Sequence, residues 1–315
     1  MTEKIEILSD YEHQTELIKE LEEGEKISHY QLYKDGTPYY NYASRVDGTK
    51  RIGVQDYNDF GEKHIFTSGN NILISLGCGN SEVESSFYSD GRNNNMDYVG
   101  VDSSQSMLNF SEKQFENYPN TNTKLVKIDF MDKNFHYIMN GITQSYDKKI
   151  FAFFGATFGN IPYRTIMNTL YNMLEKGEQV WISIGLRQGT TLHDDNAYCE
   201  KYHQSLSDKF GIGGLVFNVL EKHGISLQDG KLGIKFEEND EINSVSFKFI
   251  FQFKRKIKII INNTHIQFQP NQEIELYTIQ RYTPEGLIEL FESYGFKFIE
   301  KQTKELSGQF LFEKI

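Results

Sequence analysis

The feature that most constrains the fold of this chain is a regular alternation of short apolar segments and amphipathic segments between residues 70 and 186. Each apolar segment has the length of one buried strand, and the amphipathic segments show the periodicity of helices. Strands that alternate with helices through short connections are typical of a parallel, doubly wound sheet. The expected strands are 72–77, 96–102, 124–129, 148–155 and 178–186. The expected helices are 81–88, 103–118 and one opened by Pro162.

The C-terminal segment indicates how this sheet ends. A helix is expected over 283–296, where Thr283 and Pro284 favour its start and Gly295 favours its end. Two strands, FKFIEKQ and QFLFEKI, follow it. A helix followed by a terminal β-hairpin is how methyltransferase sheets usually end, whereas a dinucleotide-binding sheet usually ends in a parallel strand. The sequence therefore predicts an α/β fold with a Rossmann-like class I methyltransferase sheet.

The alternation breaks after Leu186, which indicates a second, smaller α+β domain. Consecutive β-like segments favour an antiparallel insertion. The expected strands there are 231–238, 244–252 and 254–262, and the expected helices are 192–209, 214–223 and, near the N-terminus, 14–23. The predicted domains are a cofactor-binding domain, 63–189 with 279–315, and a substrate-binding domain, 1–62 with 190–278.

Composition restricts the partners and the compartment. The chain has 44 acidic and 33 basic residues and a net charge of −11, which disfavours nucleic acid as a partner. A basic run at 253–260 is interpreted as an exposed strand. Two cysteines, Cys78 and Cys199, cannot form a disulfide framework and are expected as reduced thiols. No run approaches the roughly 20 apolar residues of a membrane span. We therefore expect a soluble, cytoplasmic protein that has no membrane or nucleic-acid partner.

A glycine turn follows the first strand of the alternating region, in the sequence LGCGNSE at 76–82. Gly77 and Gly79 permit a sharp turn and a close approach of the backbone to a ligand. Asp102, 25 positions after Gly77, ends the next strand, where a carboxylate can accept hydrogen bonds from both ribose hydroxyls of an adenosine. The alternative is that Asp102 only caps the helix that starts at Ser103.

Two further residues fit an adenosine-containing cofactor. Asp129 and Phe130 follow the third strand and are expected to flank the adenine, although a turn residue and a core phenylalanine would fit the same positions. Glu82 occupies the place of the third glycine of G-x-G-x-x-G, which disfavours a pyrophosphate. S-adenosylmethionine (SAM), which carries no phosphate, is therefore the predicted cofactor, and NAD is the alternative.

The segment FFGATFGNIP at 153–162 carries a more specific pattern. Together with LGCGNSE, VDSS, IDF, VFNVLEKHGISL, QRYTPEGLIELFESYGF and GQFLFEKI, it resembles the histidine-specific Nα-methyltransferase family of ergothioneine biosynthesis over about residues 70–315. The resemblance implies that Asn160 holds the amine and carboxylate of an amino-acid substrate, and an amide offers the donor and the acceptor needed. The alternative for Asn160 is a helix cap before Pro162.

The resemblance also completes the predicted sites. It implies that Thr157 and Gly159 lie beside the methionine moiety of the cofactor. The predicted cofactor-binding residues are Ser75, Gly77, Cys78, Gly79, Asp102, Ser103, Asp129, Phe130, Gly155 and Thr157. The predicted catalytic residues are Asn160, Tyr198, Tyr202 and Tyr277, with Tyr198 and Tyr202 as the two candidates for one family tyrosine.

Departures from the family concern the substrate. The family usually has an acidic residue where Ser75 stands, and it reads the imidazole with a Glu-x-Ser pair where this chain has Tyr277 and Ile279. A pocket discriminates through polar groups that the wrong ligand leaves unpaired. The loss of both groups disfavours histidine, so we expect an N-methyltransferase for another amino acid or a related small amine.

Several alternatives stay open. Methylation of a peptide or protein amine, a non-catalytic SAM-binding scaffold and an NAD-dependent enzyme are the competing functions. A dense set of tyrosines either covers the substrate or packs on the second domain: Tyr30, Tyr33, Tyr39, Tyr40 and Tyr42. The segment 192–203 offers proton-transfer candidates, but a solvated helix face is favoured there. His193, Cys199 and His203 have no evident further ligand, so no metal is expected. The sequence leaves the oligomeric state open.

Overall fold

The structure is a computed structural model that describes residues 2–34, 51–66, 69–89, 96–155, 157–187 and 206–315. Its contacts divide the chain into two compact units. The first unit comprises Met1–Leu8, Asp47–Leu186 and Tyr282–Ile315, and the second comprises Ser9–Val46 and Arg187–Arg281. Residues 1–8 and 47–62, which the sequence analysis grouped with the substrate-binding domain, thus fall in the first unit.

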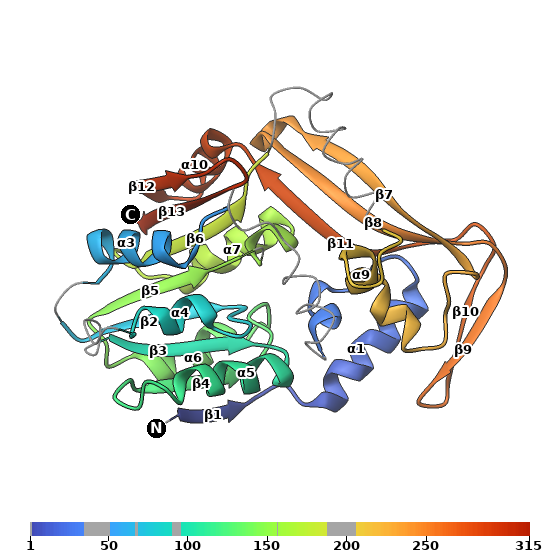
Figure 1. The fold of residues 1–315 in the computed structure, drawn as a ribbon, viewed down its shortest axis with the longest axis horizontal. Helices are drawn as coiled ribbons and strands as arrows, with labels where there is room; N and C mark the ends of the chain where they lie inside the picture. Colours follow the sequence, from blue (N-terminus) through green and yellow to red (C-terminus); the bar gives the residue numbers. More distant parts are fainter. Residues whose placement is uncertain (1, 35–50, 67–68, 90–95, 156, 188–205) are drawn as a thin grey trace. The chain divides into compact units, whose positions relative to one another are not determined.

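The first unit is built on an eight-stranded sheet with the order β1-β4-β3-β2-β5-β6-β13-β12 (Figure 1). Its first six strands in chain order are parallel, whereas β13 is antiparallel to both β6 and β12. The strands are β1 (Thr2–Glu6), β2 (Asn71–Leu76), β3 (Met96–Asp102), β4 (Thr123–Lys127), β5 (Lys148–Phe153), β6 (Gln179–Gly185), β12 (Phe296–Thr303) and β13 (Ser307–Lys314). The predicted α/β sheet and its terminal hairpin are confirmed.

Helices and a short 3-10 helix connect these strands. They are α3 (Val54–His64), α4 (Glu82–Ser86), α5 (Gln105–Phe115), α6 (Phe135–Thr143), the 3-10 helix η2 (Phe158–Asn160), α7 (Tyr163–Met173) and α10 (Pro284–Ser293). The core against one face of the sheet centres on Trp181, which is fully buried. The ring of Phe60 from α3 stacks on Trp181 with centroids 5.5 Å apart, and the ring of Phe87 does the same. Burial of these large rings holds α3 and α4 on the sheet.

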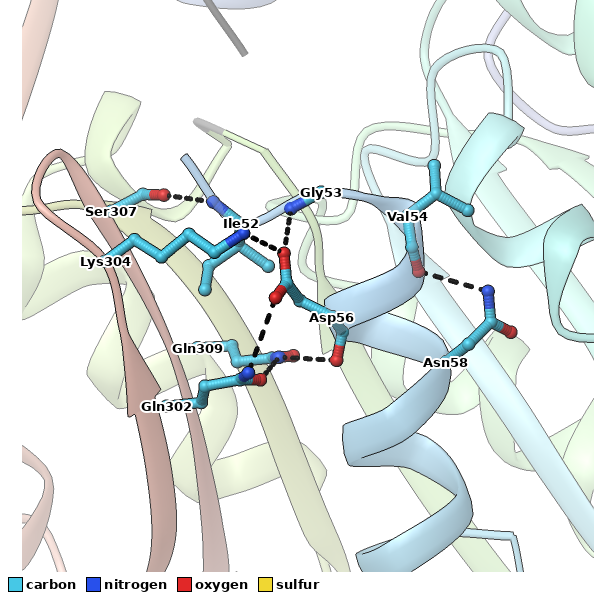
Figure 2. A network of polar contacts seen from close by, with 9 residues as sticks. All are labelled: Ile52, Gly53, Val54, Asp56, Asn58, Gln302, Lys304, Ser307 and Gln309. Carbon is cyan, nitrogen blue, oxygen red and sulfur yellow. Dashed lines mark hydrogen bonds and ion pairs between the residues drawn. The ribbon is translucent and has the colours of Figure 1, made fainter. Parts of the chain in front are cut away.

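A polar network fixes the start of α3 to the C-terminal hairpin (Figure 2). The Asp56 carboxylate accepts a hydrogen bond from the N–H of Gly53 at 2.8 Å and pairs with Lys304 Nζ at 2.5 Å. Gln309 donates from Nε2 to the Asp56 carbonyl oxygen at 3.0 Å and accepts from Trp181 Nε1 at 3.0 Å. Segment 51–64 is therefore tied to the sheet by polar contacts as well as by apolar ones.

The second unit contains α1 (Asp10–Glu23), the 3-10 helix η1 (His29–Tyr33) and α9 (Ile212–Glu221) beside two small sheets. One sheet has the order β11-β8-β7 and the other pairs β9 with β10 in antiparallel fashion. The remaining elements are β7 (Gly230–Asn239), the 3-10 helix η3 (Asp240–Ile242), β8 (Ser244–Phe253), β9 (Ile257–Ile261), β10 (Thr264–Phe268) and β11 (Glu273–Tyr282).

The core of the second unit is rich in phenylalanine. Alternate residues of β8 are buried, and three of them, Phe249, Phe251 and Phe253, are fully buried among residues from α1 and α9. This period of two is the pattern expected for a sheet with one apolar face. The predicted consecutive strands are confirmed for β7, β8 and β9. Of the predicted helix 192–209, residues 192–205 lie outside the described residues.

Candidate cofactor and substrate site

The glycine turn after β2 adopts the backbone conformation that the sequence predicts. Gly77 and Gly79 have φ values of 68° and 54°, in the left-handed region that favours glycine. The N–H groups of Gly77 and Cys78 donate to the Val101 carbonyl oxygen at 2.8 and 3.0 Å, which fixes the turn to β3. A Cβ at Gly77 would lie 2.6 Å from Cγ2 of Thr157, whereas a Cβ at Gly79 would meet no atom within 4 Å. The turn therefore packs tightly on one side and leaves space at Gly79.

Asp102 connects this turn to the start of α5. Its Oδ2 accepts a hydrogen bond from the N–H of Gly79 at 3.0 Å, and its Oδ1 accepts from the N–H of Ser104 at 2.9 Å. The residue that caps α5 is Ser104, whose Oγ accepts from the N–H of Met107. Burial raises the pKa of the Asp102 carboxyl to about 6, although the N–H groups of Ser104 and Gly79 oppose the shift. A ribose role for Asp102 remains a prediction, but simple capping of α5 is not its role here.

Ser75, one of the predicted cofactor-binding residues, contacts a carboxylate from another element. Its side chain is fully buried, and its Oγ donates to Oε1 of Glu84 at 2.5 Å. Glu84 lies in α4 and is only 2% exposed. The sequence does not indicate a role for Glu84, because nine residues separate it from Ser75 and a short helix gives little periodicity. A carboxylate is therefore present beside Ser75, although it does not come from the strand.

Two further predicted cofactor-binding residues, Cys78 of the glycine turn and Ser103 before α5, are buried. Cys78 is 7% exposed, and burial raises the pKa of its thiol well above the ordinary range. Beneath the turn, the hydroxyl of Ser81 contacts the hydroxyls of Tyr98 and Ser111 at 2.8 and 2.6 Å. Ser103 is 8% exposed between Asp102 and the cap of α5. The polar groups of this region are thus arranged in a compact network under the turn.

The predicted adenine residues follow β4. Oδ1 of Asp129 accepts a hydrogen bond from the N–H of Met131 at 2.9 Å, which stabilises a turn. Phe130 is 5% exposed, and its ring meets those of Phe153 and Phe135 edge to face at 5.8 and 6.4 Å. Both observations agree with the alternative roles of these residues, a turn residue and a core phenylalanine. Their adenine roles stay predictions.

The loop after β5 brings Thr157 to the glycine turn, and the N–H of Asn160 donates to the Thr157 carbonyl oxygen at 3.1 Å. Because β5 pairs with β2 in parallel, the two loops leave the same edge of the sheet. Thr157 contacts Gly77 there, and Gly155 has a φ of 77°. Asn160 is 6% exposed, and its Oδ1 has no hydrogen-bond partner among the residues that the structure describes. Pro162 is the N-cap residue of α7, and no side chain caps that helix, so Asn160 is not its cap.

A second buried polar atom in this region was not anticipated from the sequence. Tyr282, at the end of β11, is fully buried, and its hydroxyl has no hydrogen-bond partner in the described part of the chain. Its ring lies 6.1 Å from that of Phe158, two positions before Asn160. Buried polar groups are usually paired, so an unpaired one requires an explanation, and a partner supplied by a ligand or by a water molecule is one such explanation.

Of the remaining predicted catalytic residues, Tyr277 is among those that the structure describes. Tyr277 lies on β11 in the second unit, where it is 3% exposed and its hydroxyl contacts that of Tyr33 at 2.9 Å. Ile279 on the same strand is 9% exposed. Tyr198 and Tyr202 lie outside the described residues, as do the residues of the segment considered for a metal, His193, Cys199 and His203. Among the residues that are described, no three His, Cys, Asp or Glu side chains form a group that could hold a metal.

The sheet order, the antiparallel C-terminal hairpin, the glycine turn after β2 and the carboxylate that ends β3 together define a class I SAM-dependent methyltransferase. A sequence model of one family within this class, described as histidine-specific, SAM-dependent methyltransferases, matches residues 61–312. The chain therefore belongs to this family, and its cofactor is SAM.

Three solved structures to which this chain is similar are distant from it in sequence. A SAM-dependent methyltransferase from Anabaena variabilis is 14% identical, with 92% of this chain and 96% of that chain covered and a TM-score of 0.47. The CcbJ methyltransferase from Streptomyces caelestis is 12% identical, with coverages of 83% and 95% and a TM-score of 0.43. A SAM-dependent methyltransferase from Methanosarcina mazei is 12% identical, with coverages of 81% and 97% and a TM-score of 0.43.

The curated protein sequences contain no match to this chain. Within the described ranges, no helix combines the length and the apolar character that crossing a membrane requires.

Proposed function

We propose that this methyltransferase transfers the methyl group of SAM to the nitrogen of a small amine, an amino acid or a related compound other than histidine. The observation that carries the proposal is the buried Oδ1 of Asn160, which has no hydrogen-bond partner among the residues that the structure describes. An unpaired amide oxygen costs about 1–3 kcal/mol, and an amine or ammonium N–H can recover this by donating to it. Asn160 follows Thr157, which contacts the glycine turn, so an amine held by Asn160 would lie near the cofactor.

The residues around the turn fit the cofactor. Space at Gly79 allows the methionine moiety to approach the backbone, and Asp102, whose two oxygens each accept one N–H, retains lone pairs for the ribose hydroxyls. When bound, SAM supplies an electrophilic methyl group on a sulfonium. The protein then has to align a neutral amine nitrogen with that methyl group and exclude water, because positioning and desolvation supply most of the catalysis in such a transfer.

The identity of β11 residues supports a substrate other than histidine. The hydroxyl of Tyr277 is already engaged with that of Tyr33, and Ile279 offers no polar atom. An imidazole would therefore find neither the carboxylate nor the hydroxyl that the family uses to recognise it. A site without these groups is expected to lose most of its discrimination for histidine, since polar pairing supports discrimination of up to about 10⁴–10⁵-fold.

The test is incubation of the purified protein with methyl-labelled SAM and a panel of amino acids, biogenic amines and short peptides, followed by mass spectrometry. We expect N-methylation of a small amine and at least tenfold lower kcat/KM for histidine than for the best substrate. Histidine as the best substrate would refute the substrate proposal. Binding of S-adenosylhomocysteine (SAH) without turnover of any amine would instead indicate a non-catalytic scaffold.

A further inference from the structure

Glu84 is a buried carboxylate under the glycine turn that the proposed reaction does not yet use. It is 2% exposed, and its partner Ser75 is fully buried. In the described part of the chain, no Lys, Arg or His side chain forms an ion pair with Glu84. A buried ionised carboxylate is costly unless a cation compensates it. The Glu84 carboxyl is therefore either protonated or compensated by a positive charge that a ligand supplies.

Among the residues that the structure describes, none that interacts with Glu84 supplies a positive charge. Burial raises the pKa of its carboxyl to about 7, and the hydrogen bond from Ser75 only partly opposes the shift. The titratable groups that interact with Glu84 from the neighbouring elements are Cys78 of the turn, Tyr88 after α4, and Tyr98 and Asp102 of β3. All four are acids that are neutral when protonated and negative when ionised, so none of them supplies a positive charge, and burial raises their pKa values as well.

The position of Glu84 points to the methionine end of the cofactor. Ser75 precedes the glycine turn by two positions, and Asp102, the predicted ribose ligand, is close enough to influence the charge of Glu84. Methionine in SAM carries an α-ammonium group, and that group needs an acceptor with negative charge. Ser75 donates its hydroxyl proton to Glu84, so the Ser75 oxygen keeps lone pairs for a cationic donor.

We propose that Glu84 is the counter-charge for the α-ammonium of the cofactor, with Ser75 bridging the two. This inference rests on the cofactor site assigned above to the glycine turn and Asp102. It differs from a purely structural role, in which a protonated Glu84 would only hydrogen-bond Ser75. The two roles differ in one measurable way, because binding of an ammonium favours the ionised form of Glu84 and releases its proton.

The test compares two ligands and three variants by isothermal titration calorimetry. SAH carries the α-ammonium, whereas 5′-methylthioadenosine keeps the adenosine and lacks the amino-acid part. Glu84→Gln removes the charge and keeps the shape. Glu82→Gln, an exposed residue of the same helix, is the matched control. Ser75→Asp combined with Glu84→Gln returns a carboxylate to the same place from the strand.

At pH 8, we expect Glu84→Gln to weaken SAH binding by at least tenfold and to change methylthioadenosine binding by less than twofold. Glu82→Gln should change neither by more than twofold, and the Ser75→Asp/Glu84→Gln double variant should regain SAH affinity. Near pH 7, in buffers of different ionisation enthalpy, the wild type should release more protons with SAH than with methylthioadenosine. Glu84→Gln should lose this excess.

Two results would overturn the inference. One is unchanged SAH affinity in Glu84→Gln, and the other is an equal loss for both ligands. Failure of the underlying cofactor site has a different signature, because then the wild type binds neither ligand, or Asp102→Ala binds both as tightly as the wild type does.

Discussion

At the scale of single residues, two carboxyl groups make the cofactor site sensitive to pH. Glu84 and Asp102 have pKa values raised by burial to about 7 and about 6, from ordinary values of 4.5 and 3.8. Because the unfolded chain ionises at lower pH than the folded one, these groups lower the free energy of unfolding as pH rises from about 4 to 7. This decrease in the free energy of unfolding is complete above about pH 7.

This shift predicts an unusual stability profile for Glu84→Gln. Raising the pH should destabilise the variant less than the wild type. The free energy of unfolding of the variant, relative to that of the wild type, should therefore increase between pH 5 and pH 8 by on the order of 2–3 kcal/mol. Urea denaturation at the two pH values measures this difference. An advantage that is the same at both values would show that the Glu84 pKa is not raised.

Asp102 belongs to the same scale but acts on a different part of the ligand. Asp102→Ala removes the acceptor of two backbone N–H groups and, by our proposal, of the ribose hydroxyls. We expect SAH and methylthioadenosine to bind about 10–100-fold more weakly, in line with a loss of about 1–3 kcal/mol. Calorimetry measures both affinities, and Asp97→Ala at the opposite end of β3 serves as the control. Unchanged affinity in Asp102→Ala would contradict the ribose assignment.

A substitution at Asn160 should impair substrate use without weakening cofactor binding. Replacing it with alanine removes the unpaired buried oxygen, so kcat/KM for the amine should fall about 10–100-fold while SAH affinity stays within twofold. Steady-state kinetics and calorimetry together measure the two effects. An equal loss in both would mean that Asn160 serves the cofactor.

At the scale of elements, the strands were more predictable than some helices. Buried strands such as β2 and β6 are continuous apolar runs between turn residues, and this signal is local. The edge strand β1 pairs with a single neighbour and is largely polar, so it gives no such pattern. Helix α3 begins at Val54, its N-cap residue Gly53 has no side chain to cap it, and its buried residues are few. Its place depends on partners more than 100 residues away, which no local pattern reveals.

The residues of the candidate site show the same difference between local signals and long-range packing. Gly77, Gly79 and Asp102 could be predicted because a turn and a strand end fix each of them locally. Glu84 and Tyr282 could not, because their significance appears only when α4 is packed beside β2 and when Tyr282 is buried beside Phe158. The roles of Tyr198 and Tyr202 are still predictions.

The network at the start of α3 gives a prediction at this scale. Asp56→Ala would free the N–H of Gly53 and remove the ion pair with Lys304 (Figure 2). Loss of a helix-start hydrogen bond costs about 1 kcal/mol, so the unfolding free energy should fall by about 1–2 kcal/mol. Urea denaturation checks the value. Asp59→Ala, in the same helix but exposed, should have less than half that effect.

At the scale of the whole molecule, the thermal stabilisation produced by different ligands should show which cofactor the protein binds. A ligand that binds only the folded state stabilises it by about 2.7 kcal/mol at 100 times its Kd. We therefore expect SAH at saturating concentration to raise the thermal unfolding midpoint and NADH at equal concentration to leave it unchanged. Differential scanning calorimetry decides between them. A shift with NADH alone would contradict the SAM assignment.

The position of β13 in the sheet has a consequence for how the protein folds during synthesis. The chain passes from one unit to the other four times, and β13, which fills the place between β6 and β12, is formed by residues 307–314. During synthesis, the edge of β6, where Trp181 pairs with Leu311 of β13, therefore lacks its neighbour until residues 307–314 have left the ribosome. A nascent chain that stalls before residue 307 presents an open, apolar sheet edge to the chaperones of the cell.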